Sequence, residues 1–448
     1  MSGPLEAIRV VDFSRVLAGP LCAETLLDLG AEVIKVEPPT PDVSRSSFPF
    51  KEGMSGYYAQ QNAGKRNVSI DLNVPGARDL VLRLCDSADI VVENFRPGTL
   101  GSFGLDYETL AQRNPDLIYA SITGYGQGGP WRGRMAYAPT VQAEAGFTEN
   151  SIRHYGEALA EPRTDALSHA DVYGGLQAVI AILAALHRRK STGRGQYIDI
   201  AMAATLMAVN ERAHLDLSDD NIGAEPAVLG ATDCPFFRGP NGEQFTVATS
   251  IVGSMTFPSY MRAMRRGDLI DDPRFATAAA RRQNLAALHA IIQTWILTFS
   301  DMATLDAQFD EAKIAFGEIH SIRELSESDW SDYWGGVREV PDRYGGSYRL
   351  PGNPWRFSAE DLKPPGAPAF QGEHNRSVLA ELGLTEEEIE RHVASGALVS
   401  HVPEAIPHDQ MTDGKDLDAR TTVESTSKLG GPRGTRDARA EGGSQRRP

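Results

Sequence analysis

The stretch IRVVDFSRVLAGPLCAETLLDLGAEVIKVE, residues 8–37, decides the fold class of this chain. A short β-branched run at 8–13 is followed by amphipathic sequence of helical length near 21–28, and then by a second β-branched run at 31–37. Strand-like and helix-like periodicity in this order predict a β-α-β unit. The chain is therefore expected to begin in a sheet whose strands run parallel.

The same alternation continues outward from this unit as far as residue 202. The helix predicted at 172–189 is apolar on nearly all faces, which is typical of a buried helix. Alternation of this kind predicts an α/β fold with a mostly parallel, doubly wound sheet, here in a first domain over residues 1–215. The further elements are predicted as strands at 66–72, 88–95, 116–123 and 196–202, and as helices at 78–85 and after Asp106.

The second half of the chain has a different character, and residues 225–330 are predicted to form a smaller α+β domain. It opens with a hairpin at 236–250, marked by a Pro-Asn-Gly turn, and continues in apolar helices such as 285–299. Residues 340–403 are expected to return to the first domain. The polar, Gly-rich tail at 404–448 is predicted to be disordered, because it cannot bury enough apolar surface to offset the entropy of ordering.

Composition and residue spacing exclude several classes of protein. A chain of 448 residues can bury a large core, but a formal net charge of -16 would repel a phosphate backbone, so nucleic-acid binding is not expected. The three cysteines show no CxxC spacing and the histidines no HExxH, so neither a disulfide framework nor a metal site is predicted. The sequence shows no signal peptide, and its longest apolar run is shorter than the ~20 residues of a membrane span. We therefore expect a soluble, cytoplasmic protein with no membrane partner.

The glycine motif ITGYGQGGPW matches a dinucleotide fingerprint, since Gly124, Gly126 and Gly129 give GxGxxG directly after a predicted strand. Such a motif must open a helix whose N-terminus faces the pyrophosphate. Here Pro130 and Gly133 follow, and no helical periodicity begins. A glycine loop beside a ligand is the preferred interpretation, and a dehydrogenase is disfavoured.

Asp171 is the candidate catalytic residue. It stands in SHADVYGG at the start of the apolar helix, where its carboxylate could simply cap the helix by accepting backbone N–H bonds. The same place suits a nucleophile, because a helix N-terminus favours an ionised carboxylate and the following Gly174 and Gly175 leave room beside it. A carboxylate nucleophile splits acyl transfer into easier steps when N–H groups stabilise the oxyanion. The loop GYGQGGP at 124–130 could supply those donors.

Basic residues cluster at the edges of two predicted strands. Lys65 and Arg66 stand in NAGKRN, and Arg96 stands in ENFRPG. Each cluster could be a solvated surface. An acidic protein that binds a phosphorylated ligand nevertheless needs local cations, so a ligand contact is the preferred interpretation.

Several stretches, taken together and in order, resemble the class III CoA-transferases, the group that includes formyl-CoA:oxalate and carnitine CoA-transferases. The resemblance covers residues 5 to about 400. It implies a Rossmann-like large domain built from both chain ends, an inserted small domain, and a homodimer of interlocked subunits. The stretches are RVVDFSRVLAGP, DLGAEVIKVEPP, NAGKRNVSIDL, ADIVVENFRPG, LIYASITGYGQGGP, HADVYGGLQAVIAILAAL, STGRGQYIDIAM, DDPRFATAAARRQN and GEHNRSVLAELGLTEEEIE.

The resemblance also assigns roles by position, beginning with the nucleophile at Asp171. The formyl-CoA enzymes have a Lys near Met135 and a Glu at Ala138, so oxalate is not supported as the acceptor, and Arg134 is a candidate for the missing Lys charge. His169 is the histidine nearest to the nucleophile in sequence. CoA contacts are implied at Arg15, Leu17, Ala18, Asn62, Lys65, Arg66, Asn94, Phe95 and Arg96. Substrate-pocket positions are implied at Gly124, Tyr125, Gly126, Arg134 and Tyr137.

The implied reaction moves CoA from an acyl-CoA to a free carboxylic acid through an aspartyl anhydride and an aspartyl-CoA thioester. The CoA thioester is a substrate, and no permanently bound cofactor is expected. Two alternatives stay open at this point. One is an α-methylacyl-CoA racemase, although its typical GHDINY segment reads GRMAYA at 133–138. The other is a CoA-binding protein without catalysis, against which the intact Asp171 and the glycine loop count.

Overall fold

The computed structural model describes residues 3–155, 165–211, 213–217 and 235–403. The predicted disordered tail, residues 404–448, lies outside the described residues.

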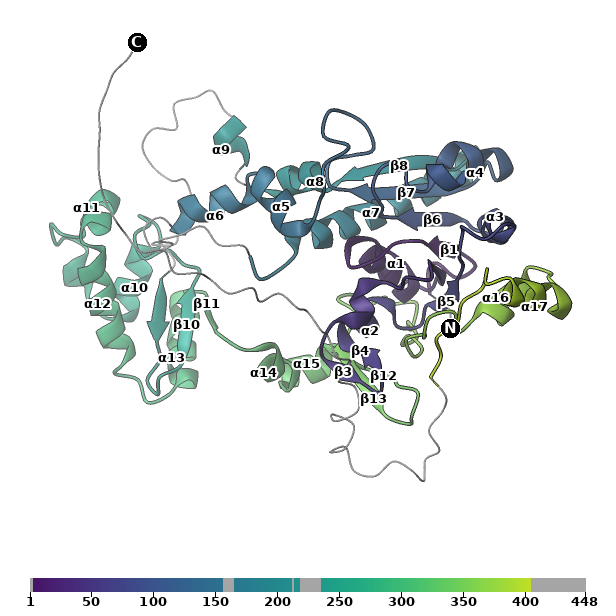
Figure 1. Cartoon of the computed structure of the whole chain (residues 1–448). Helices are drawn as coiled ribbons and strands as arrows, with labels where there is room; N and C mark the ends of the chain where they lie inside the picture. Colours follow the sequence, from purple (N-terminus) through teal and green to yellow (C-terminus); the bar gives the residue numbers. More distant parts are fainter. Residues whose placement is uncertain (1–2, 156–164, 212, 218–234, 404–448) are drawn as a thin grey trace, which may run out of the picture. The chain divides into compact units, whose positions relative to one another are not determined.

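A six-stranded sheet forms the centre of the fold, and all its neighbouring strands run parallel. This confirms the mostly parallel sheet predicted from the sequence. In spatial order the strands are β5 (Arg66–Ser69), β2 (Glu32–Glu37), β1 (Arg9–Asp12), β6 (Ile90–Glu93), β7 (Ile118–Thr123) and β8 (Gln196–Ala201) (Figure 1). The inner strands β2, β1, β6 and β7 are almost entirely buried, as expected of a parallel sheet covered on both faces, whereas the edge strand β8 alternates with exposed residues.

Helices cover both faces of this sheet and enclose two separate apolar cores. Each core joins one set of alternating strand side chains to one set of helices, which is how a doubly wound sheet buries both faces. The helices of the first core are α1 (Ala18–Asp28), α5 (Ala138–Glu144), α7 (His169–Thr192) and α8 (Met202–Val209). Those of the second are α3 (Ala77–Asp86), α4 (Tyr107–Arg113), α16 (Asn375–Glu381) and α17 (Glu386–Ala394).

Strand order changes direction between β1 and β6. From β1 the chain adds β2 and β5 on one side, and then crosses back to place β6, β7 and β8 on the other. The chain therefore continues from β1 and from β6 to helices on opposite faces of the sheet, α1 and α4. In open α/β sheets, ligands bind outside the carboxyl ends of the strands at such a switch point. The two loops are 14–17 and 94–96, and both contain residues at which the resemblance implies CoA contacts.

Helix α7 is long and apolar enough to cross a membrane by length and composition, yet it is a core helix. Ala178, Ile182 and Leu186 are buried against the sheet. The prediction of a buried core helix is confirmed for the face that packs on the sheet, whereas Leu176 and Ile180 on another stripe are exposed. Periodicity alone could not separate the two stripes, since both are apolar.

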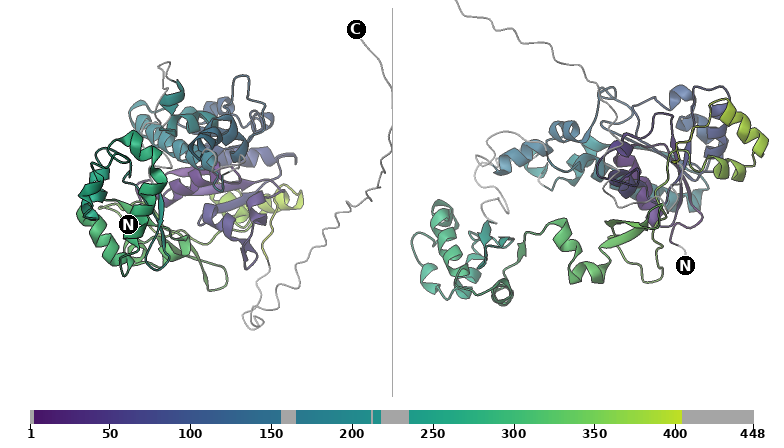
Figure 2. Two further views of the ribbon diagram at one scale, coloured as in Figure 1. Left: turned by 90° about the vertical axis from the view of Figure 1, so that its left-hand side faces the viewer. Right: turned by 60° about the horizontal axis from the view of Figure 1, so that its bottom comes forward.

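A three-stranded antiparallel sheet occupies the predicted small α+β region. Its first two strands form the predicted hairpin, with Gly242 in the left-handed conformation that the turn requires. A third core lies between this sheet and the helices around it, which Figure 2 shows in teal and green. The strands are β9 (Phe236–Arg238), β10 (Gln244–Val247) and β11 (Phe316–Glu318), and the helices are α10 (Phe257–Ala263), α11 (Ala278–Gln283), α12 (Leu285–Ile296) and α13 (Met302–Ala312).

The remaining elements join these parts. The short helices α6 (Phe147–Tyr155) and α9 (Ala213–Leu217) flank α7 and α8 in the chain. Between β2 and β5 lie η1 (Val43–Ser46), the strand pair β3 (Phe50–Lys51) and β4 (Met54–Ser55), and α2 (Gly56–Asn62). After the small sheet come α14 (Ile322–Ser326), α15 (Asp329–Trp334) and the hairpin of β12 (Val337–Pro341) and β13 (Ser347–Pro351).

The last described segment lies along β5, the edge strand of the large sheet (Figure 1). The backbone of Asn67 exchanges hydrogen bonds with His374, whose ring accepts at 3.1 Å and whose N–H donates at 2.9 Å. Further along, the N–H of Val399 donates to the carbonyl of Ser69 at 3.1 Å. Residues 374–399 therefore cover the hydrogen-bonding groups of an edge that would otherwise be open.

Candidate active site

The turn from β1 into α1 forms one wall of the candidate site, and distant side chains fix its backbone. Lys35 donates to the carbonyl of Ser14 at 2.6 Å. Asn94 holds Arg15 from both sides, accepting from its N–H at 2.9 Å and donating to its carbonyl at 2.8 Å. The turn is thereby tied to β2 and to the loop after β6.

Asp171 lies in the first turn of α7, beside the end of this β1–α1 turn. The backbone N–H of Ala18, the first residue of α1, lies near the Asp171 carboxylate and acts to lower its pKa. Gly175 makes the approach of the two helices possible, because a Cβ there would lie only 2.5 Å from the Ala18 carbonyl oxygen. The cap interpretation is wrong, since Ser168 occupies the N-cap of α7. Asp171 lies near another helix instead.

The charge state of Asp171 follows from two opposing effects. Partial burial raises the pKa of its carboxyl from 3.8 to about 6, and the Ala18 N–H acts in the lowering direction. Burial therefore outweighs the helix N-terminus, which was expected to favour ionisation. At pH 7 about nine in ten carboxyls are still ionised, so the group can act as a nucleophile.

Tyr57 of α2 is a neighbour that sequence reasoning missed. Burial raises the pKa of its phenol, and the negative charges of Asp171 and Asp42 raise it further. The phenol therefore stays protonated at neutral pH and can only donate a hydrogen bond toward a negative centre. A lone Tyr in a helix carries no motif, and its place beside Asp171 depends on tertiary contacts across more than 100 residues.

Lys65 and Asn62 lie inside the protein. The Lys65 ammonium pairs with Asp12 at 3.0 Å and also donates to the Pro20 carbonyl and the Asn62 side chain. Burial lowers the pKa of Lys65, while the Asp12 carboxylate opposes that shift. Contact of Lys65 or Asn62 with a CoA phosphate stays a prediction. The arrangement does not favour it, because both side chains are buried and bonded to each other.

Arg66 is also paired within the protein. Its guanidinium binds Glu32 at 2.9 Å and Glu381 at 2.6 Å, which links β5 to α16. Its contact with CoA likewise stays a prediction, and a ligand phosphate would have to compete with two carboxylates.

Arg15 and Arg96 are the exposed cations at the switch point between β1 and β6. Within the described ranges, neither forms an ion pair. Asn94 brings their loops together through the bonds to the Arg15 backbone, and the N–H of Phe95 donates to the buried carboxylate of Glu93 at 2.8 Å. Both loops are therefore held rigidly while their guanidinium groups stay free for a ligand. Leu17 and Ala18 are buried, so only their backbone can face a ligand.

The glycine loop after β7 opens no helix. The next helix is α5, which starts only at Ala138, so the dinucleotide interpretation of Gly124 and Gly126 has no support in the fold. The loop is bound to its surroundings, because the Gly126 N–H donates to the Thr123 hydroxyl at 2.9 Å and the Gln127 side chain donates to Glu93 at 3.2 Å.

Arg134 and Tyr125 form a polar cluster over α5. Both bind Glu144, and the Arg134 nitrogen lies 2.6 Å from its carboxylate. The guanidinium also stacks over the Trp131 ring at 4.0 Å. Tyr137 is exposed at the start of α5. That these residues line the substrate pocket stays a prediction. A substrate carboxylate that binds Arg134 would have to compete with Glu144.

Known proteins match the chain over most of its length. A profile of the CoA-transferase family III matches residues 5–375. The chain is 35% identical over 398 residues to the succinate–glutarate CoA-transferase of Agrobacterium fabrum, which covers 86% of this chain and 96% of that protein. It is 30% identical over 421 residues to the formyl-CoA:oxalate CoA-transferase of Streptomyces avermitilis, covering 89% and 100%. The chain belongs to CoA-transferase family III.

The crystal structure of a CAIB/BAIF family protein from Brucella suis agrees with this assignment. Its TM-score to the present structure is 0.73 at 32% identity, covering 85% of this chain and 100% of that one. The resemblance seen in the sequence is thereby confirmed. This transferase moves CoA between an acyl-CoA and a carboxylic acid, and CoA enters as part of a substrate.

His169 does not lie on the same face of α7 as Asp171. Residues two apart on a helix point about 200° apart, so His169 and Asp171 lie on different faces of α7. The His169 ring instead stacks on Tyr173 and lies 3.4 Å from the Asp165 carboxylate. The acid-base pair that a racemase requires is therefore not formed by these two residues.

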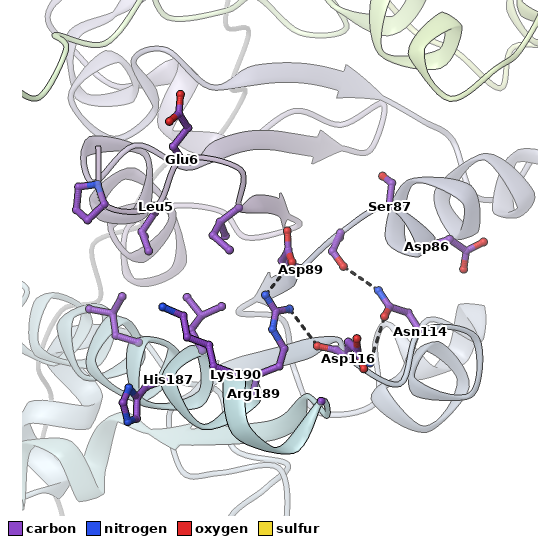
Figure 3. Close-up of a pocket in the computed structure, with 16 residues that line it drawn as sticks. Leu5, Glu6, Asp86, Ser87, Asp89, Asn114, Asp116, His187, Arg189 and Lys190 are labelled. Carbon is purple, nitrogen blue, oxygen red and sulfur yellow. Dashed lines mark hydrogen bonds and ion pairs between the residues drawn. The ribbon is translucent and has the colours of Figure 1, made fainter. Parts of the chain in front are cut away.

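A surface pocket of about 770 Å³ lies at the opposite edge of the sheet, where the strands begin (Figure 3). Arg189 crosses it, paired with Asp89 at 2.8 Å and donating to the Asp116 carbonyl at 3.2 Å. The Arg189 charge is thus already paired, and the loops that follow β1 and β6 lie at the other edge of the sheet. In the part of the chain that the structure describes, no cluster of three metal-ligating side chains occurs.

Proposed function

We propose that Asp171 is the nucleophile of CoA transfer. Its carboxylate attacks the thioester carbonyl of the donor, the carbon–sulfur bond breaks, and CoA leaves as thiolate from a mixed anhydride. The thiolate then attacks the aspartyl carbonyl, which releases the donor acid and leaves an aspartyl-CoA thioester. The acceptor carboxylate attacks that thioester to form a second anhydride, and CoA thiolate finally takes the acceptor acyl group and frees Asp171.

One observation carries this proposal: Asp171 lies in the first turn of α7, where Gly175 packs on the backbone of Ala18, next to the loop of the topological switch point. The Ala18 N–H beside the carboxylate can bind the oxyanion that forms on the aspartyl carbonyl, without reorganisation. The free guanidinium groups of Arg15 and Arg96 lie on the two loops of that switch point and suit the CoA phosphates. Buried Lys65 supports the site indirectly, by holding Asp12 below the turn.

We infer that the acids exchanged are short dicarboxylic acids. The relative from Agrobacterium fabrum is named for succinate and glutarate and is more similar to this chain than the oxalate enzyme. A second carboxylate needs a cation near the nucleophile, and Arg134 is the candidate, with Glu144 as the group it must leave or share. Succinyl-CoA with a panel of C4 to C6 diacids and monoacids of equal length tests this. Faster transfer to the monoacids would refute it.

Trapping of the intermediate tests the nucleophile. Purified enzyme is incubated with succinyl-CoA alone, quenched with hydroxylamine, and digested for peptide mass spectrometry. The peptide that contains Asp171 is expected to carry a hydroxamate. Asp171→Asn should fold, because Asn has nearly the same shape and can still accept from the Ala18 N–H, and it should show no transfer.

Glu144→Gln is the control, because it removes a carboxylate from the predicted pocket wall but not the nucleophile. Hydroxamate on another residue, or full transfer activity in folded Asp171→Asn, would sink the mechanism.

We further propose that the enzyme is a homodimer, with the exposed stripe of α7 in the interface. Leu176, Ile180 and Leu183 repeat at helical spacing along this stripe and are 38%, 58% and 37% exposed. An apolar stripe of this kind marks a protein contact in a chain of this size. Ile180→Asp should give monomers by light scattering. Val393→Asp on α17 is the control for an exposed apolar residue elsewhere, and an intact dimer of Ile180→Asp would contradict this interface.

We also propose the finer architecture and location predicted from the sequence. The strand order, renumbered along the chain as 3-2-1-4-5-6, supports the description as Rossmann-like. The core between β9, β10 and the surrounding helices supports an inserted small domain at 225–330. Limited proteolysis that never yields this piece intact would argue against the inserted domain. Membrane-bound activity in fractionated cells would argue against a cytoplasmic enzyme.

A further inference from the structure

Val16 occupies an unfavourable backbone conformation in the turn that leads to the Ala18 donor. Its φ of +70° lies in the left-handed region, which a β-branched residue rarely adopts. The sequence offers no glycine or asparagine at this position to make the conformation easy. Some other interaction must therefore hold it.

Asp42 is that interaction. Both of its carboxylate oxygens accept from the Val16 N–H, at 3.1 and 3.2 Å. The carboxylate is buried and pairs with the fully buried ammonium of Lys35 at 3.2 Å, while Lys35 also holds the neighbouring Ser14 carbonyl. A further bond from the Ser44 N–H, at 3.0 Å, fixes the carboxylate from the other side. A strained residue that is over-determined in this way is typical of functional sites.

The strained residue is two positions before the donor to Asp171. Leu17 is the N-cap of α1 and Ala18 its first residue, so a rotation at Val16 moves the Ala18 N–H directly. Gly175 of α7 packs on the Ala18 carbonyl, so α7 and the Ala18 backbone are in close contact. A shift of the Ala18 N–H would therefore change its position relative to the Asp171 carboxylate. The buried pair of Asp42 and Lys35 thus acts on Asp171 indirectly: Asp42 holds the Val16 N–H, and the conformation of Val16 sets the position of the Ala18 N–H.

We propose that Asp42 is a positioning residue for the CoA-transfer reaction, which sets the Ala18 N–H against Asp171 by holding Val16 in its left-handed conformation. The inference rests on the proposed role of Asp171 and adds a residue that touches neither substrate nor nucleophile. Asp42 supports the reaction from beneath the turn, and its effect should be seen in the chemistry rather than in CoA-ester binding.

Two variants separate positioning from direct charge effects. In Asp42→Ala the Val16 N–H loses its acceptor, the turn relaxes, and Ala18 no longer stabilises ionised Asp171, so the pH midpoint for acyl-enzyme formation should move upward. Loss of a nearby negative charge alone would move the midpoint downward, because the ionised carboxylate would become easier to form. Asp42→Asn keeps an oxygen acceptor for Val16 and should recover most of the rate that Asp42→Ala loses.

Acyl-enzyme formation from succinyl-CoA is measured from pH 4.5 to 8 in a single turnover, by rapid trapping of Asp171 as the hydroxamate. KM is measured separately at steady state, and stability by thermal unfolding. Asp42→Ala should lose about tenfold or more in rate, as expected for a misplaced donor, with little change in KM. Asp342→Ala is the matched control, because the Asp342 side chain is also only 2% exposed, pairs with Lys51 at 2.9 Å, and accepts from the N–H groups of Tyr344 and Gly346.

The outcomes are distinct. If the wild-type enzyme forms no Asp171 adduct, the proposed role of Asp171 is wrong, and the inference about Asp42 falls with it. If the adduct forms, and Asp42→Ala shows a rate and a pH midpoint equal to those of Asp342→Ala, the positioning role is refuted. Should Asp42→Ala fail to fold, Asp42→Asn carries the test: because Asn keeps the oxygen acceptor for Val16, a tenfold or greater loss of rate in the folded Asp42→Asn protein would likewise refute the role.

Discussion

Gly175→Ala is the sharpest test of how α1 and α7 position Asp171, the proposed nucleophile. The new Cβ would lie 2.5 Å from the Ala18 carbonyl oxygen and 3.4 Å from Cδ2 of Leu21. An ordinary carbon–oxygen contact is about 3.3 Å, so α7 and α1 must separate locally by about 0.8 Å. Overpacking of this kind costs about 1–3 kcal/mol, and the better helix propensity of Ala returns about 1 kcal/mol. The net loss of folding free energy is expected to be about 1 kcal/mol.

The effect on activity should be larger than the effect on stability. A displacement approaching 1 Å at a reacting group can lower the rate by about 100-fold, and here it separates the carboxylate of Asp171 from the Ala18 N–H. We expect kcat to fall by that order with little change in KM, because the cations on the loops stay in place. The assay measures product thioesters by liquid chromatography and unfolding by calorimetry.

Gly174→Ala is the matched control, since it makes the same propensity change one residue earlier. Its Cβ would meet Cγ of Met202 at 3.0 Å, a side chain that can adjust. If both variants retain wild-type kcat, or if both lose it equally, close packing at Gly175 does not position the nucleophile.

Three further outcomes follow from the site. Because burial raises the pKa of Asp171 to about 6, the rate of acyl-enzyme formation should be full above that pH and fall tenfold per unit below it as the carboxylate is protonated; a midpoint near 4 would contradict the burial effect. Arg96→Glu should raise the Kd for CoA esters by tenfold or more, whereas Arg194→Glu, an exposed residue at the other edge of the sheet, should not; equal effects would mean that only net charge matters. A 2-methylacyl-CoA in heavy water should gain no α-deuterium, as read by mass spectrometry, and rapid incorporation would favour racemase chemistry.

The sequence predicted the large sheet well because its strands and helices are encoded locally. Strands such as Ile118–Thr123 are β-branched and apolar on both faces, and helices such as Ala77–Asp86 have a clear amphipathic period. The position of Asp171 at the start of α7, followed by two glycines, was also visible. These features need only neighbouring residues to be recognised.

Features that depend on distant partners were not predictable in this way. Lys65 looked like a surface cation, but its partner Asp12 is 53 residues away, and only the folded chain brings them together. The conformation of Val16 has no local signal, because Asp42 imposes it from the loop after β2. The exposed stripe of α7 could not be told from its buried stripe, since both are apolar and only the sheet decides which faces inward.

The cover over β5 has a consequence for biosynthesis. Ser69 and its neighbours leave the ribosome early, but Val399, whose N–H closes this edge, is made 330 residues later. Until then the nascent chain exposes an open strand edge, which is a template for pairing with other chains. Joining such distant segments also makes the final step slow, because long loops must close before the contacts form. The large sheet is therefore protected from aggregation only once translation has passed Val399.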